Sequence, residues 1–263
     1  MRKYLSMMLA VVLLCGAIPA LAGEVPTSEY YDTPQAAVAT LVERVAEGSF
    51  DSALNVMADQ SMAQGYNYAA LVERIGQISP AVPMTSPSDY AAYVPLNALR
   101  KRAQNSFQLH MLITSLVLPE IGDLLYPLMV TDAGVQVNAD TVLPLSEYVA
   151  RYNPENIGEL QLHSVLQLDS PQFHSESNQT NLSRMAAING YLEQLELLAI
   201  LSYKGQLKQL GLSAARFEQG WQLISLNAPL IGTEVSGGAT PTDEAEVQAL
   251  LDSGNFLQVY PVQ

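Results

Sequence analysis

Helical and strand patterns are separated along this chain, and their order limits the possible folds. Apolar residues recur every three or four positions in the first part of the sequence, whereas alternation of apolar and polar residues concentrates after residue 159. A βαβ protein would interleave the two patterns along its whole length. We therefore expect an α+β fold, with helices first and strands later.

The clearest single element is a helix that begins near residue 33. Asp32 is a capping residue, Pro34 suits the first helical turn, and Gln35 stands three positions after the cap. Gly48 ends the pattern. Four apolar residues at helical spacing mark the buried face of this helix: Val38, Leu41, Val42 and Val45.

The same patterns predict the remaining elements. Further helices are expected at residues 50–57, 66–78, 145–152, 181–198 and 243–251. Strands are expected at 107–118 (where a helix is the alternative) and 159–169, and hairpins at 126–138 and 207–227 with turns at 132–134 and 218–220. Loops or linkers are expected at 79–95, which holds four prolines, at 170–180 and at 233–242.

The N-terminal segment has the three parts of a cleavable secretory signal. Arg2 and Lys3 give a positive start, an apolar run follows, and Ala20-Leu21-Ala22 forms a small-x-small cleavage site. Cys15 raises the alternative of a lipid anchor, but Leu14 stands where a lipidation site needs a small residue. We expect cleavage after Ala22 and a periplasmic or extracellular location in a bacterium.

The mature chain would contain no cysteine, because Cys15 is the only one. It would therefore lack disulfides, thiolate metal sites and cysteine nucleophiles, and its stability must come from an ordinary apolar core. Loss of Arg2 and Lys3 takes the formal net charge from −14 to about −16. Such a surface repels nucleic acid, which is not expected as a partner. No second apolar run is long enough for a transmembrane helix in the mature chain.

Two stretches resemble the NTF2-like (cystatin-like cone) superfamily. In residues 33–57, Gly48-Ser49-Phe50-Asp51 and Ala53 match the order of a long helix, a glycine, a small or acidic residue, an aromatic and a second helix. In residues 215–229, Gly220-Trp221 precedes an alternating strand, as in the final hairpin of many members. The resemblance implies a curved antiparallel sheet packed on N-terminal helices, often with an apolar pocket. It implies no single activity.

The resemblance also suggests a domain division. We expect a cleaved signal peptide at 1–22 and an NTF2-like α+β domain at 23–232. One such domain needs only about half of the chain, so residues 80–180 would form a large elaboration. Residues 233–263 would be a linker and a short C-terminal helix.

Few residues carry recognisable chemistry. The three histidines, His110, His163 and His174, have no metal-ligand spacing, and no hydrolase, zinc-protease, phosphate-loop or dinucleotide motif occurs. We therefore predict no catalytic, cofactor-binding or metal-binding residue, and no cofactor. The basic run 100–102 is expected to be a solvated helix end or, second, to contact the acidic surface. The clustered tyrosines are expected to be surface aromatics or the rim of a sugar or peptide site.

These observations favour a soluble, exported, non-catalytic binding or interaction module of the bacterial cell envelope. Its partner would be a small molecule or a protein that the sequence does not identify. The alternative is a small hydrolase or isomerase that uses a pocket inside the cone. For that alternative, Asp51, His110 and His163 are the polar groups to examine first.

Overall fold

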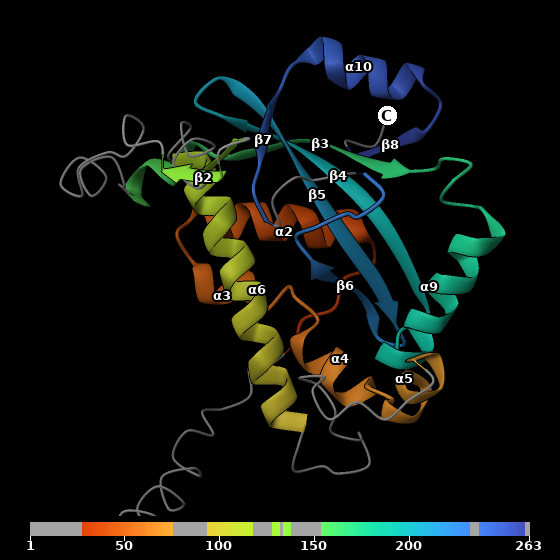
Figure 1. The fold of residues 1–263 in the computed structure, drawn as a ribbon. Helices are drawn as coiled ribbons and strands as arrows, with labels where there is room; N and C mark the ends of the chain where they lie inside the picture. The colour runs from red at the N-terminus through yellow and green to blue at the C-terminus, as the bar shows by residue number, and fades with distance from the viewer. Residues whose placement is uncertain are drawn as a thin grey trace, which may run out of the picture.

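The computed structural model describes residues 28–75, 94–117, 128–131, 134–137, 154–231 and 237–260. It has the predicted α+β class, with helices followed by a curved antiparallel sheet (Figure 1). The predicted signal peptide, most of the proline-rich segment and the helix predicted at 145–152 lie outside the described residues.

One sheet organises the structure. Its five main strands are β3 (Gln161–Leu168), β4 (Glu193–Tyr203), β5 (Gln206–Phe217), β6 (Gly220–Ser225) and β8 (Phe256–Tyr260). They lie in the order β6-β5-β4-β3-β8, and each neighbouring pair is antiparallel. The short strand β7 (Thr240–Thr242) pairs with the start of β5. Strands β1 (Leu128–Thr131) and β2 (Gly134–Val137) form a separate hairpin, as the sequence predicts.

Helices precede the sheet and also follow two of its strands. They are α2 (Pro34–Ala46), α3 (Phe50–Leu54), α4 (Asp59–Gly65), α5 (Tyr68–Ile75), α6 (Val94–Val117), α9 (Glu176–Asn189) and α10 (Glu244–Asp252), with a 3-10 turn η4 at Pro154–Glu159. The cap of α2 is Thr33 rather than Asp32, because Thr33 Oγ1 accepts a hydrogen bond from the Ala36 N–H at 3.2 Å. Gly48 follows this helix with φ +71°, a conformation that suits glycine.

The inner face of the sheet packs against α2 and α6. Alternate residues of β4 point to this face, and Leu197, Ala199 and Leu201 are fully buried there. The intervening Leu198 and Ile200 point to the outer face, where they pack with residues of α10. Near the other end of the outer face, Ala215 and Ile224 pack with residues of α4 and α9. The sheet therefore has packed helices on both faces.

Two predicted elements are wrong. Residues 107–118 belong mostly to the long helix α6, not to a buried strand, since the core residues of this stretch have helical spacing: Leu109, Leu112, Ile113 and Leu116. The helix predicted at 181–198 begins earlier, at Glu176, and ends at Asn189, because Gly190 adopts φ +75° as its C-cap. The rest of that predicted helix enters strand β4.

The C-terminal segment also differs from expectation. The helix predicted at 243–251 is confirmed as α10. However, the predicted linker contributes β7, and the unpredicted strand β8 pairs with β3. Two elements from the predicted middle elaboration belong to the main body of the fold. Helix α6 contributes to the main core, and β3 lies inside the sheet between β4 and β8.

Candidate binding site

A cavity of about 520 Å³ lies between α9 and the outer face of the sheet. Its walls come from α4, α5, α6, α9 and strands β4 to β6, so distant parts of the sequence meet there. Apolar side chains such as Met62 and Ile224 line part of it. The titratable and hydroxyl groups of the lining are Arg74, Lys101, Tyr191, Glu196, Ser213 and Ser225.

Glu196 supplies the only carboxylate of this lining. It is 4% exposed on the outer face of β4, directly opposite Ser213 of β5. The Leu230 N–H donates a 2.8 Å hydrogen bond to Glu196 Oε2. Burial raises the pKa of Glu196, and the backbone hydrogen bonds from Leu230 and Ile231 oppose that shift. The carboxylate thus holds the segment after β6 while it lines the cavity.

Lys101 enters the same cavity from α6. Burial lowers the pKa of its ammonium, and the charge of Asp59 acts in the opposite direction. The ion pairs within 4 Å among the described residues include none with Lys101. A desolvated cation that faces a cavity suits an anionic group of a ligand.

Arg74 and Tyr191 have internal partners. The Arg74 guanidinium contacts Met185 Sδ and donates to Asn181 Oδ1 at 3.1 Å. The Tyr191 hydroxyl donates to Gln194 Oε1 at 2.6 Å, and burial raises the pKa of this tyrosine to about 12. These contacts fix the side chains that surround the cavity.

A second polar cluster lies beside Lys101. Asp59 of α4 is 5% exposed, accepts a short hydrogen bond from Asn105 Nδ2, and has Arg102 Nη1 3.6 Å from its Oδ2. Desolvation raises the pKa of Asp59 to about 6, although the Asn105 hydrogen bond and the Arg102 and Lys101 charges lower it. Asp59 and Asn105 do not line the cavity. We therefore regard this cluster as support for α6.

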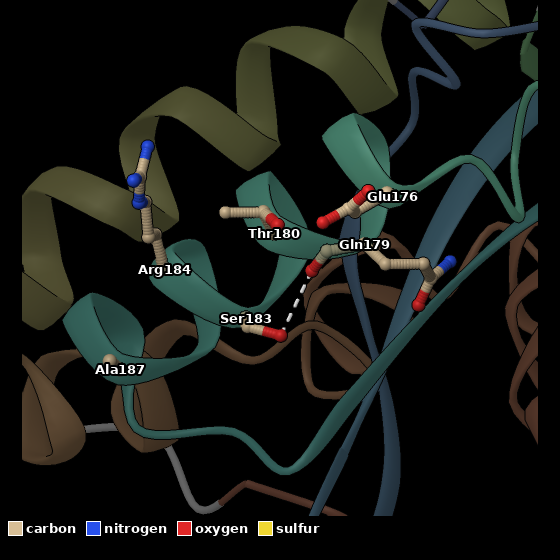
Figure 2. A pocket seen from close by; sticks show the side chains of 6 residues that line it. All are labelled: Glu176, Gln179, Thr180, Ser183, Arg184 and Ala187. Atoms are coloured by element: carbon tan, nitrogen blue, oxygen red, sulfur yellow. Dashed lines mark hydrogen bonds between the residues drawn. The ribbon is translucent and has the colours of Figure 1, made fainter.

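Two other hollows lie on the outer face of the sheet and on α9. One, of about 700 Å³, lies beneath α10 and has apolar side chains on its floor, including Leu198 and Phe256. Leu230 lines both this hollow and the polar cavity, so the segment after β6 separates them. Another is a shallow depression whose labelled residues, from Glu176 to Ala187, all come from α9 (Figure 2). A depression on one helix brings no distant groups together.

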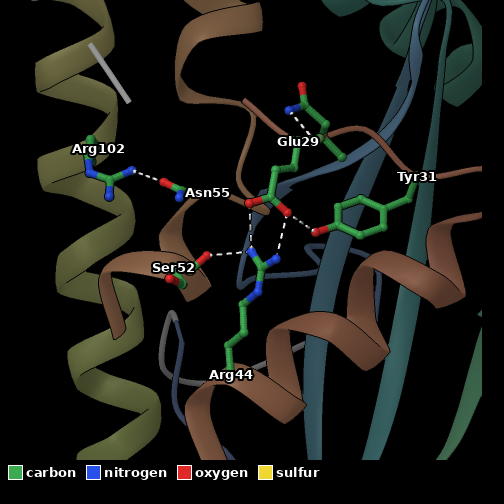
Figure 3. Close-up of polar contacts among 7 residues, drawn as sticks. Glu29, Tyr31, Arg44, Ser52, Asn55 and Arg102 are labelled. Carbon is green, nitrogen blue, oxygen red and sulfur yellow. Dashed lines mark hydrogen bonds and ion pairs between the residues drawn. The ribbon is translucent and has the colours of Figure 1, made fainter. Parts of the chain in front are cut away.

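The N-terminal polar cluster has a structural role (Figure 3). Arg44 donates from Nη1 to Glu29 Oε1 at 3.1 Å and from Nη2 to Oε2 at 2.7 Å, and the Tyr31 hydroxyl donates to Oε2 at 2.9 Å. Arg44 also donates to the Ser52 carbonyl at 2.8 Å. The hydrogen bond from Arg44 is the main cause that lowers the pKa of Glu29. This cluster ties the segment before α2 to α2 and α3.

The sequence candidates do not come together. Asp51 is exposed and lies 4.0 Å from Arg102, and His110 is exposed on α6. His163 is also exposed, with its Nε2 3.5 Å from Glu244 Oε1. The basic run contributes a contact with the protein itself, because Arg102 donates to Asn55 Oδ1 at 3.3 Å. Tyr30 and Tyr31 form hydrogen bonds with Ser61 and Glu29 and do not line the cavity, and Tyr90 and Tyr93 lie outside the described residues.

A second histidine–carboxylate pair is closer than that of His163 and Glu244. His174 Nε2 lies 2.6 Å from Asp169 Oδ1 at the turn between β3 and α9. Both side chains are more than a third exposed, and Asp169 lines none of the hollows described above. His174 lines a small hollow of about 320 Å³ between α9 and the sheet. No described histidine lies in the apolar core that fills the inner face.

Sequence reasoning missed the two central cavity residues. Lys101 was expected in a solvated helix end, and Glu196 was expected inside a helix. Residues 197–201 form a continuous apolar run directly after Glu196, and such a run, typical of a strand buried on both faces, was the available signal. No sequence pattern could show that this strand and the helix of Lys101 share a cavity.

Comparisons with known proteins support the fold. No protein-family model matches the chain, and no curated protein matches it in sequence. The crystal structure of a cystatin-like protein from Ruminococcus gnavus ATCC 29149 is similar, with a TM-score of 0.51 and 17% identity. The match covers 86% of this chain and 45% of that protein, so the present chain corresponds to less than half of it. This similarity supports the cystatin-like or NTF2-like cone fold.

Two features are absent from the part of the chain that the structure describes. In those ranges, no helix combines the length and apolar character needed to cross a bilayer. The same ranges hold no group of three or more histidine, cysteine, aspartate or glutamate side chains suited to a metal ion.

Proposed function

We propose that this chain is an exported, non-catalytic binding module of the bacterial cell envelope, which holds a small molecule or a short peptide in the cavity beneath α9. The convergence of Lys101, Glu196 and Arg74 on a single hollow carries the proposal. A volume of about 520 Å³ lies within the range of small-molecule sites in proteins. Export follows from the predicted signal peptide and remains part of the proposal.

The filled inner face favours binding on the outer face. Leu197, Leu212 and Leu223 are fully buried against the helices, together with the other residues of the main core. A ligand on that side would have to displace packed apolar side chains, which is costly. The hydrolase or isomerase alternative needed a pocket inside the cone, and both histidine–carboxylate pairs of the described residues, His163–Glu244 and His174–Asp169, have exposed side chains and lie outside the main core.

A bulky substitution at the cavity lining tests the binding site. Asn181 is exposed on α9 and lines the cavity, so N181W should obstruct it without disturbing the core. Ala187 is exposed on the same helix and does not line the cavity, so A187W is the matched control. We expect native mass spectrometry of the protein purified from its source to show a bound small molecule in wild type and A187W but not in N181W. A wild-type protein without any bound molecule, or equal retention in N181W, would contradict the proposed site.

The exported form can be tested separately by intact mass. Cleavage after Ala22 gives a chain that starts at Gly23. A chain that starts at a lipidated Cys15 would show a membrane-anchored protein and would replace the proposed free form.

A further inference from the structure

We infer that the cavity beneath α9 selects a zwitterionic ligand, a free amino acid or a short peptide, with its ammonium at Glu196 and its carboxylate at Lys101. This inference rests on the proposed binding function and adds the chemical class of the ligand. It follows from the signs, the burial and the bonding of the charged groups that line the cavity.

The two charges come from different walls and do not neutralise each other. Glu196 projects from β4 and Lys101 from α6, and the ion pairs of the described residues include none between them. Each group is desolvated enough for its pKa to move toward the neutral form. A ligand that carries both charges would restore a favourable partner to each group at once.

The bonding of each group leaves capacity for a ligand. Lys101 lines the cavity, its Nζ has three donors, and the ion pairs of the described residues include none with it. Glu196 Oε2 receives the Leu230 N–H, and an ionised carboxylate has about four acceptor positions in total. An ammonium can therefore bind this carboxylate without displacing the segment after β6.

The overall charge of the protein disfavours a simple anion. The formal net charge is −14, and a negative molecule must approach against that field. A zwitterion has no net charge and avoids this penalty. It also offers a group of opposite sign to each kind of charge in a lining that presents two cations and one carboxylate.

The test uses the amino acid and dipeptide fraction of a casein digest as the probe. One portion stays unmodified, a second is N-acetylated to remove the ammonium, and a third is C-terminally amidated to remove the carboxylate. Each portion is dialysed against the purified protein, and native mass spectrometry identifies the retained masses. We expect unmodified molecules to be retained, and either blocked portion to bind at least about tenfold more weakly, the loss expected for one charged hydrogen bond.

Variants assign each end of the ligand. K101M should remove the preference for a free carboxylate, and E196Q should remove the preference for a free ammonium. The matched controls K204M and E218Q alter exposed residues outside the cavity and should bind as wild type. E196Q weakens a buried contact with Leu230, so circular dichroism must confirm that this variant folds. The N-acetylated portion tests the need for a free ammonium on wild-type protein, without any substitution.

The outcomes separate this inference from the proposed function. Equal retention of the blocked and unmodified portions would overturn the zwitterion assignment. If N181W abolished that retention, the proposed binding site would still be supported. Absence of retention from all three portions would also overturn the assignment. In that case, native mass spectrometry of the protein purified from its source would still test the proposed binding function.

Discussion

Replacement of Asp59 by asparagine should stabilise the protein at neutral pH and remove much of its pH dependence. Asp59 Oδ2 and Asn105 Oδ1 are both buried and have no hydrogen-bond partner among the described residues, while Asn105 Nδ2 donates to the other carboxylate oxygen. A proton on Oδ2 would give the amide oxygen a donor. An asparagine at position 59 can supply the same pair of hydrogen bonds without a proton from solvent.

The size of the effect follows from the pKa of Asp59, which rises from 3.8 to about 6 in the folded protein. That difference corresponds to about 3 kcal/mol. Between these values the folded protein binds the proton more tightly than the unfolded chain. The stabilisation from protonated Asp59 is therefore fully present below about pH 4 and is lost as the pH rises toward 6. It changes little above that pH.

Urea denaturation from pH 4 to pH 8 measures this effect on wild type, D59N and the control D51N. We expect D59N and wild type to be similar near pH 4, and D59N to gain up to about 3 kcal/mol by pH 7. Loss of the attraction from Arg102, 3.6 Å away, reduces that gain. The Asp51 carboxylate is exposed although it also faces Arg102, so D51N should change stability by less than about 0.5 kcal/mol.

The comparison between variants removes the contributions of other titrating groups. Burial raises the pKa of Glu196, and hydrogen bonding lowers that of Glu29, but both groups are present in wild type and D59N. A difference that is independent of pH would refute the reasoning. A D59N protein that is less stable than wild type above pH 6 would show that Arg102 stabilises an ionised Asp59.

Three further predictions concern stability and use the same denaturation assay. G190A should lower the free energy of unfolding by about 2 to 5 kcal/mol, because φ is +75° and the added Cβ would lie 2.5 Å from a backbone atom of α4. The control G254A, with φ +69° and open space around it, should lower it by only about 1 to 2 kcal/mol. Equal losses in the two variants would contradict the close contact at Gly190. R44M should cost about 1 kcal/mol, less at high salt, because the ion pair with Glu29 is partly exposed. L212A should cost about 2 to 5 kcal/mol because Leu212 is fully buried in the main core, and a cost below about 1 kcal/mol would contradict that placement.

Local signals predicted the two ends of the main core well. The helix around Val38 and Leu41 was predictable because its cap, its apolar spacing and its final glycine agree. The hairpin of β5 and β6 was predictable because Gly220 and Trp221 mark the turn between two apolar, alternating stretches. Each of these elements contains its own start and stop signals.

The errors came from apolar runs that fit two periods. Met185, Ile188, Leu192 and Leu195 are spaced like one helix face, yet Gly190 divides them between α9 and the region of β4. The run after residue 107 fitted a strand, with a helix as the alternative, because it is mostly apolar, and the burial of α6 from Leu109 to Leu116 explains that composition. The cavity was unpredictable for a different reason. Lys101 and Glu196 are brought together only by the packing of α6 and the sheet.

The backbone bonds between the two ends of the chain have a consequence for the order of folding. Tyr31 exchanges two backbone hydrogen bonds with Trp221, and Ala58 donates to the Leu223 carbonyl. During synthesis the first helices emerge long before these partners, and β3 emerges before its partner β8. Closure of such long loops is slow, so a partly synthesised chain cannot complete its core. The helices made first are therefore among the last elements to gain their final contacts.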